Sequence, residues 1–122
     1  MKYFFDTYAI IEIIKENVAY KKYLEEEIVT SVLNMGELYY ALLKDYDENI
    51  ADLWYNKLKQ NLLFIDPKVV IEAMKFKFKN KGKNLSFIDC VSYILAKEKD
   101  LIFLTGDKEF KGFVNVEFVN SG

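Results

Sequence analysis

The residues best suited to chemistry in this chain are four carboxylates, each standing where a short apolar run passes into a helical pattern. Asp6 follows YFF, Glu37 lies in NMGELYYAL, Asp89 in SFIDCVSYILA and Asp107 in FLTGD. The carboxyl ends of parallel strands share one edge of an open α/β sheet, so acids far apart in sequence can converge there. A carboxylate cluster in a chain without histidine suits Mg²⁺ or Mn²⁺ rather than zinc. The pattern favours phosphodiester chemistry.

Taken singly, each acid also has an ordinary structural explanation, because acids commonly cap helices. The spacing predicts capping boxes at Asn34–Glu37 and Ser86–Asp89, an N-cap at Asp6 and a capped turn at Asp107.

The set of four is more than capping requires. By comparison, Asp66 also follows an apolar run, but Pro67 after it marks an ordinary helix start. Two carboxylates ~5 Å apart repel by roughly 3 kcal/mol at an effective dielectric of ~20. We therefore expect at least one carboxyl pKa in the cluster to be raised when no cation is bound.

Length and composition predict a single folded domain over residues 1–122. Apolar residues make up 52% of the chain and the net charge is −2, which argues against disorder. The lone Cys90 excludes an internal disulfide, and the absence of histidine excludes Ser–His and Cys–His nucleophiles. No dinucleotide or P-loop fingerprint occurs, and no apolar run has the roughly 20 residues of a membrane span. Cytoplasmic residence fits this composition.

Short apolar runs alternate with helical patterns along the chain. Strands are predicted at Lys2–Phe5, Ile28–Ser31, Leu62–Ile65, Leu101–Leu104 and Val114–Val119, and helices at Tyr8–Asn17, Val18–Glu27, from Asn34, Ile50–Lys59, from Pro67 and Ser86–Lys97. Continuous apolar strands are typical of a parallel sheet that is covered on both faces. We therefore predict an α/β fold, a three-layer α/β/α sandwich with a mainly parallel five-stranded sheet.

With these residues in order, the chain resembles the PIN domain family, and within it the small VapC-type toxins of toxin–antitoxin pairs. The resemblance covers essentially the whole chain and rests on FFDTYAII, TSVLNMGELYYALLK, LSFIDCVSYILAKEKD and FLTGDKEF. It implies a Mg²⁺- or Mn²⁺-dependent endoribonuclease that cleaves RNA, often a homodimer, held inactive by a cognate antitoxin. Asp6, Glu37 and Asp89 would hold the metal, with Asp107 bound directly or through water.

Other residues are assigned supporting roles. Thr7 and Thr105 match small hydroxyl residues of the family, and we expect them to support the acids or contact phosphate; strand-end capping is the alternative. The densest basic run is a candidate RNA-binding surface, although a solvated helix end explains it as well: Lys75, Lys77, Lys79, Lys81 and Lys83. Phe76 and Phe78 between them are candidates for stacking on bases, or for the core.

Three other functions remain open. A PIN-type RNA-processing nuclease, or one acting on DNA, would use the same acids, and a non-catalytic PIN binding module would not need them. A phospho-receiver domain is a distant alternative, because it requires paired acids after the first strand and the chain has only Asp6 there. A phosphatase of the haloacid-dehalogenase type would need DxDxT, which Asp6-Thr7-Tyr8 does not supply.

Overall fold

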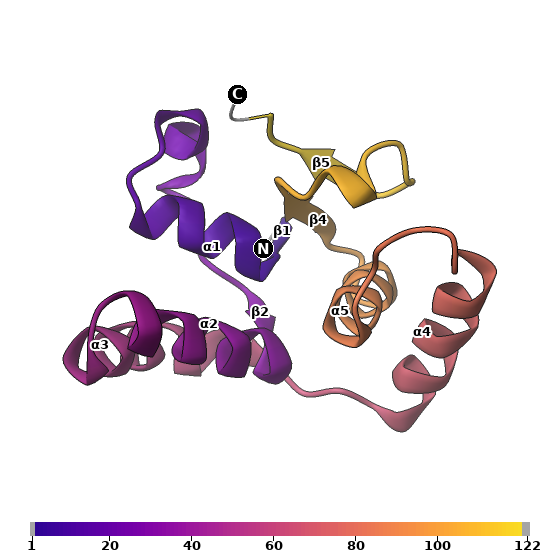
Figure 1. Cartoon of the computed structure of the whole chain (residues 1–122), viewed down its shortest axis with the longest axis horizontal. Coiled ribbons are helices and arrows are strands. Elements are labelled where there is room, and N and C mark those ends of the chain that lie inside the picture. Colours follow the sequence, from indigo (N-terminus) through magenta and orange to yellow (C-terminus); the bar gives the residue numbers. More distant parts are fainter. Residues whose placement is uncertain (1, 121–122) are drawn as a thin grey trace.

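A computed structural model describes residues 2–120, which form five short strands, five α-helices and three 3₁₀ helices. Strands and helices alternate along the chain, as the sequence predicts (Figure 1). In chain order the elements are β1 (Tyr3–Phe5), α1 (Thr7–Ile14), η1 (Val18–Tyr23), β2 (Thr30–Ser31), α2 (Val32–Asp45), α3 (Glu48–Leu58), η2 (Lys59–Asn61), β3 (Leu62–Leu63), α4 (Pro67–Lys79), α5 (Phe87–Glu98), β4 (Ile102–Thr105), η3 (Lys108–Phe110) and β5 (Val116–Phe118).

All strand pairs are parallel, which confirms the predicted sheet type. One sheet has the order β1-β4-β5, with Phe4 opposite Phe103, and a second pairs β2 with β3. The two meet side by side, because the Phe5 N–H donates to the Val29 carbonyl at 2.8 Å and the Thr30 hydroxyl donates to the Phe5 carbonyl at 2.8 Å. The predicted single five-stranded sheet is therefore present as two adjoining parts.

Helices cover both faces of the strands, which gives the three predicted layers (Figure 1). Successive strand residues point to opposite faces, and Phe5 accordingly packs with the α1–α3 cluster while Phe4 packs with the α4–α5 cluster. Phe4 and Phe103 are fully buried and stack with ring centroids 5.8 Å apart. Burying each such ring stabilises the fold by about 1.5–3 kcal/mol. This core fixes the strand ends that carry Asp6 and Asp107.

Several element boundaries differ from prediction for local reasons. The helix predicted to run to Asn17 ends at Ile14, with Lys15 as its C-cap. Glu16 then takes a positive φ of 61°, and Asn17 caps a new turn. That turn is the 3₁₀ helix η1, which ends at Tyr23 instead of continuing as the predicted helix to Glu27.

Two strands are shorter than predicted: β2 lacks the first two residues of Ile28–Ser31, and β3 lacks the last two residues of Leu62–Ile65. Ser31 is the N-cap of α2, and Asp66 with Pro67 begins α4. No helix in the part of the chain that the structure describes is long and apolar enough to cross a membrane.

Candidate active site

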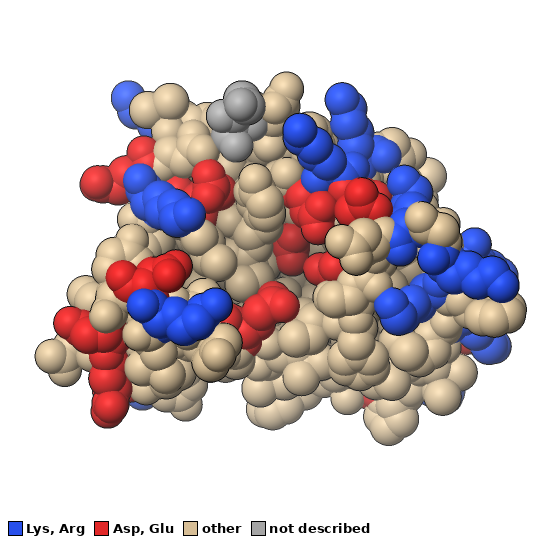
Figure 2. All heavy atoms as spheres, viewed as in Figure 1, with Lys and Arg blue, Asp and Glu red and all other residues tan. Residues whose placement is uncertain are grey.

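The four acids line one pocket of ≈ 240 Å³, together with Thr7, Tyr8, Ile11 and Ala41. Asp6 directly follows β1 and Asp107 follows β4 by two residues, while Glu37 lies on α2 and Asp89 in the first turn of α5. Figure 2 shows acidic side chains in a hollow at the middle of one face. The predicted convergence of the four acids is therefore present, and their catalytic roles stay a prediction.

Asp6 is the most enclosed of the acids, with only 4% of its surface exposed. Its carboxylate accepts hydrogen bonds from the Thr7 N–H at 2.9 Å and the Thr105 hydroxyl at 2.6 Å. Burial raises the pKa of Asp6 from 3.8 to about 7; the nearby Asp89 and Glu37 also raise it, and the two hydrogen bonds lower it. One acid of the cluster therefore has the raised pKa that the sequence predicts, with burial as a larger cause than repulsion between the acids.

Asp89 is held by the predicted capping box. Its side chain accepts from the Ser86 N–H at 2.8 Å, and the Ser86 hydroxyl accepts from the Asp89 N–H at 3.0 Å. Burial is the main cause that raises the pKa of Asp89; the Ser86 bonds lower it, Asp107 raises it and Lys77 lowers it. The box fixes this carboxylate at the positive end of the α5 dipole.

Asp107 is joined to Asp6 through one hydroxyl group. The Thr105 hydroxyl donates to Asp6 and accepts the Asp107 N–H at 3.1 Å. Asp107 also caps η3 by accepting the Glu109 N–H at 3.0 Å. Three of the four acids therefore have the capping roles that the sequence offered as the ordinary explanation, and they line the pocket as well.

The predicted capping box at Asn34–Glu37 is wrong. Ser31 is the N-cap of α2, and its hydroxyl oxygen accepts from the Leu33 and Asn34 N–H groups at 3.2 and 3.1 Å. The serine hydroxyl competes better because it lies at the residue where extended backbone turns into helix. Glu37 is consequently not used as a cap and faces the pocket.

Asn34 has a different role that the sequence reasoning missed. Its fully buried amide donates to the Thr7 hydroxyl at 3.0 Å, and its oxygen lies 2.6 Å from the Ser31 hydroxyl and 2.9 Å from the Ser92 hydroxyl. These contacts join α1, α2 and α5, the helices that follow Asp6 or carry Glu37 and Asp89. A polar residue within the apolar stretch VLNMGEL was the available signal.

We expect Asn34→Ala to reduce the free energy of unfolding by about 3 kcal/mol, because it leaves buried hydroxyl groups without their partner. Urea unfolding followed by circular dichroism measures this. Asn56→Ala is the matched control, since Asn56 is exposed on α3 and should change stability by less than about 0.5 kcal/mol. Equal stabilities of the two variants would contradict a supporting role for Asn34.

The two threonines point away from solvent. Thr7 and Thr105 are both buried, and their hydroxyl groups bond Asn34 and Asp6 respectively. Between Thr105 and Asp107, Gly106 is required for steric reasons: a Cβ there would lie 2.4 Å from the Tyr8 ring and 2.6 Å from the Tyr20 hydroxyl. The back wall of the pocket is thus closely packed.

The donor set fits a hard divalent cation in its chemistry, because the pocket offers carboxylate oxygens and no nitrogen or sulfur ligand. Among residues 2–120, however, no three Asp, Glu or Cys side chains stand close enough together to hold a metal ion as they lie. Capping hydrogen bonds fix three of these carboxylates, those of Asp6, Asp89 and Asp107. Glu37, whose side chain makes no hydrogen bond to another described residue, has the freedom to move inward.

The five lysines of the predicted basic run are all exposed, on the second half of α4 and the turn after it. Lys75 pairs with Glu72 at 3.4 Å, and Lys77 donates to the Leu85 carbonyl. Figure 2 shows lysines gathered over α4, beside the acidic hollow. Within the run, Lys77 is close enough to lower the pKa of Asp89, and RNA binding by the run stays a prediction.

Comparison with known families decides the relationship. The PIN domain family model matches residues 3–115, a range that includes all four acids. The chain belongs to the PIN domain family. No curated protein matches it by sequence.

Solved structures share this PIN fold at low sequence identity. A toxin–antitoxin complex from Klebsiella pneumoniae contains a chain with 19% identity and a TM-score of 0.77, over 95% of this chain and 96% of that one. VapC20 of Mycobacterium tuberculosis, described as a toxin that cleaves the sarcin–ricin loop, has 19% identity and a TM-score of 0.78, over 95% and 99%. FitAcB of Neisseria gonorrhoeae has 19% identity and a TM-score of 0.68, over 97% and 96%.

Proposed function

We propose that this PIN domain is a Mg²⁺- or Mn²⁺-dependent endoribonuclease and the toxin of a toxin–antitoxin pair. The observation that carries the proposal is the gathering of Asp6, Glu37, Asp89 and Asp107 in one pocket, with burial raising the pKa of Asp6 to about 7. Family membership supports nuclease chemistry, and the likeness to VapC20, described as a toxin that cleaves the sarcin–ricin loop, supports a loop of nucleic acid as the substrate.

In this mechanism Asp6, Glu37 and Asp89 would hold the metal ion, with Asp107 as a direct or water-mediated ligand. A bound divalent ion would supply neutralisation of the acids, activation of a water and stabilisation of charge on the scissile phosphate. Thr105 orients the Asp6 carboxylate and favours its charged form by donating a hydrogen bond. Ser86 holds Asp89 in place, and Asn34 sets the spacing between the helices.

The test is cleavage of a mixed RNA pool by the purified chain, freed of any bound inhibitor, in Mg²⁺, in Mn²⁺ and in EDTA. We expect cleavage that requires the metal and leaves DNA of the same sequences intact. Cutting that persists in EDTA, or DNA cut in preference to RNA, would contradict the proposal. Size-exclusion chromatography with light scattering tests the homodimer that the resemblance implies. The homodimer and the cytoplasmic location both stay predictions.

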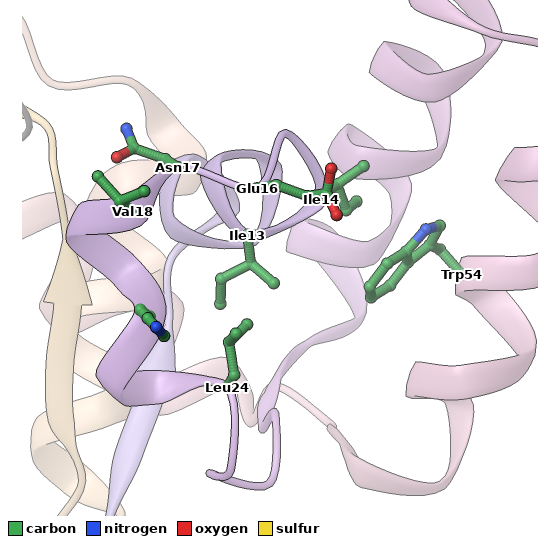
Figure 3. A pocket seen from close by; sticks show the side chains of 8 residues that line it. Ile13, Ile14, Glu16, Asn17, Val18, Leu24 and Trp54 are labelled. Atoms are coloured by element: carbon green, nitrogen blue, oxygen red, sulfur yellow. The ribbon is translucent and has the colours of Figure 1, made fainter.

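An apolar groove favours the toxin over an RNA-processing enzyme, because a toxin needs a surface for its inhibitor. Hollows of ≈ 540 and ≈ 330 Å³ adjoin between η1 and α3 and share Ile13, Leu24 and Trp54. Figure 3 shows Val18 and Leu24 on one side and Trp54 on the other. Val18 is 84% exposed and Leu24 59% exposed, so the groove offers accessible apolar side chains to a partner.

We propose that the antitoxin places apolar side chains with basic neighbours in this groove. The charged residues that line its two hollows are Glu16, Glu26, Glu27, Lys21 and Lys57. Lys57 stands over the Trp54 ring at 4.5 Å, so its charge is partly engaged. The surface therefore complements positive charge.

We expect Leu24→Asp to weaken inhibition by the protein encoded beside this gene at least about tenfold, because it places a charge in an apolar contact. Residual RNA cleavage at increasing inhibitor concentration measures the effect. Phe64→Asp is the control, since Phe64 is 85% exposed and lines neither hollow. Equal inhibition of both variants would remove the groove from the inhibitor contact.

A further inference from the structure

A third hollow of ≈ 330 Å³ lies on the basic side of the molecule. It is lined by Met74, Lys77, Phe78, Lys81 and Lys83, so it combines an apolar floor with three ammonium groups and has no acidic residue in its wall. Its size is within the range of small-ligand sites. Phe78 is 71% exposed, and the Lys81 ammonium stands 4.9 Å from its ring centroid.

The structure separates the two phenylalanines of the basic run. Phe76 is part of the core, with its ring centroid 5.0 Å from that of Tyr93 and 5.2 Å from that of Phe113. Phe78, two residues on, points to the other side of α4 and stays open to solvent. Only Phe78 can therefore stack on a ligand, and its exposed ring contributes little to folding.

The hollow is connected to the acid pocket by Lys77. This side chain lines the hollow and donates to the Leu85 carbonyl, directly before the Ser86 cap of α5. Its positive charge also acts on Asp89, one of the four acids. In Figure 2 lysines over α4 and the acidic hollow lie on the same face of the molecule.

Lysines at the end of a helix also stabilise its dipole, which accounts for Lys77 and Lys79. It does not account for Lys81 and Lys83, which follow the helix, or for an exposed aromatic ring between them. Positive charge beside an exposed aromatic ring is the combination that binds single-stranded nucleic acid.

We propose that this hollow is a subsite for an unpaired RNA nucleotide, in which the base stacks on Phe78 while Lys81 and Lys83 bind flanking phosphates. The proposal rests on the proposed ribonuclease function and adds to it a requirement for single-stranded substrate beyond the cleaved bond. Bases paired in a duplex cannot reach the ring, because they are stacked inside the helix.

The test is fluorescence anisotropy of a labelled U₁₂ RNA with the full chain in EDTA, where binding is measured without cleavage. We expect Phe78→Ala to weaken binding about tenfold, the loss typical of one base–aromatic stack, and Phe78→Tyr to retain it. Phe64→Ala removes a ring that is 85% exposed and does not line this hollow, and it should change binding less than twofold. The double variant Lys81→Gln, Lys83→Gln should lower the slope of log affinity against log salt by about 1.4.

The outcomes separate this subsite from the nuclease itself. Three results would overturn the subsite even when metal-dependent cleavage is present. The unaltered chain does not bind U₁₂, it binds duplex RNA equally well, or Phe78→Ala binds U₁₂ as tightly as the unaltered chain. Binding that depends on Phe78 in a chain that cuts no RNA upholds the subsite and overturns the nuclease. Thermal unfolding of each variant shows whether its fold is intact.

Discussion

Asp6→Asn should lower metal-dependent RNA cleavage by at least about 10²- to 10³-fold, the loss typical of removing one electrostatic catalytic group. The asparagine keeps an oxygen for the Thr7 N–H but loses the charge that attracts a cation. The free energy of unfolding of Asp6→Asn should not fall, although its activity does. At pH 8 the buried Asp6 carboxyl group of the wild-type chain, whose pKa is raised to about 7, is charged. The uncharged amide of the variant removes the desolvation cost of that charge.

The matched control for this variant is Asp66→Asn. Asp66 is also an aspartate that follows a strand and caps a helix, accepting the Lys68 N–H at 2.8 Å, but it lies outside the acid pocket. We expect it to cleave RNA at the wild-type rate. Initial rates on a labelled RNA and melting temperatures in EDTA are measured for all three proteins. Full activity in Asp6→Asn would remove Asp6 from the catalytic set.

Asp6 and Asp107 were predictable from sequence because they follow strand ends, whose position depends on topology, whereas Glu37 and Asp89 lie on helices. Parallel strands place every carboxyl end on the same edge, so Asp6 and Asp107 converge once the alternation of strands and helices is recognised. Apolar runs such as IFL also identify the buried strand β4 without knowledge of its neighbours. Direction and layering of the sheet follow from the same signals.

The supporting contacts were not predictable, because they depend on competition between equivalent local partners. Ser31 and Asn34 are both good N-caps, and the sequence alone does not decide which residue ends β2. Once Ser31 takes the cap, Asn34 lies one turn inside α2 and is buried against Thr7 and Ser92. Phe76 and Phe78, in contrast, are distinguished by helical periodicity, because Phe76 is on the same face of α4 as the buried Val69 and Ala73.

Without metal, the free energy of unfolding should fall as pH rises from about 5 to 7. Burial raises the pKa of Asp6 to about 7, so the folded chain holds a proton that the unfolded chain has already released above about pH 4. The slope should approach 1.4 kcal/mol per pH unit and level off above about pH 7, where both states are ionised. Asp89, whose pKa burial also raises, acts in the same direction.

Metal should reverse this pH dependence, because a cation stabilises the ionised carboxylates that the metal-free fold disfavours. Urea unfolding from pH 5 to 8 with EDTA or Mn²⁺ measures both effects, and the chain has no histidine that would titrate in this window. At pH 8, Mn²⁺ at 100 times its dissociation constant should raise the free energy of unfolding by about 2.7 kcal/mol. At pH 5 it should raise it little, because a proton competes for Asp6. Asp6→Asn should flatten the metal-free slope and lose most of the Mn²⁺ effect. Two results would contradict a cation site built on Asp6. One is a metal-free stability that rises between pH 5 and 7, and the other is stabilisation by Mn²⁺ that is equal at pH 5 and pH 8.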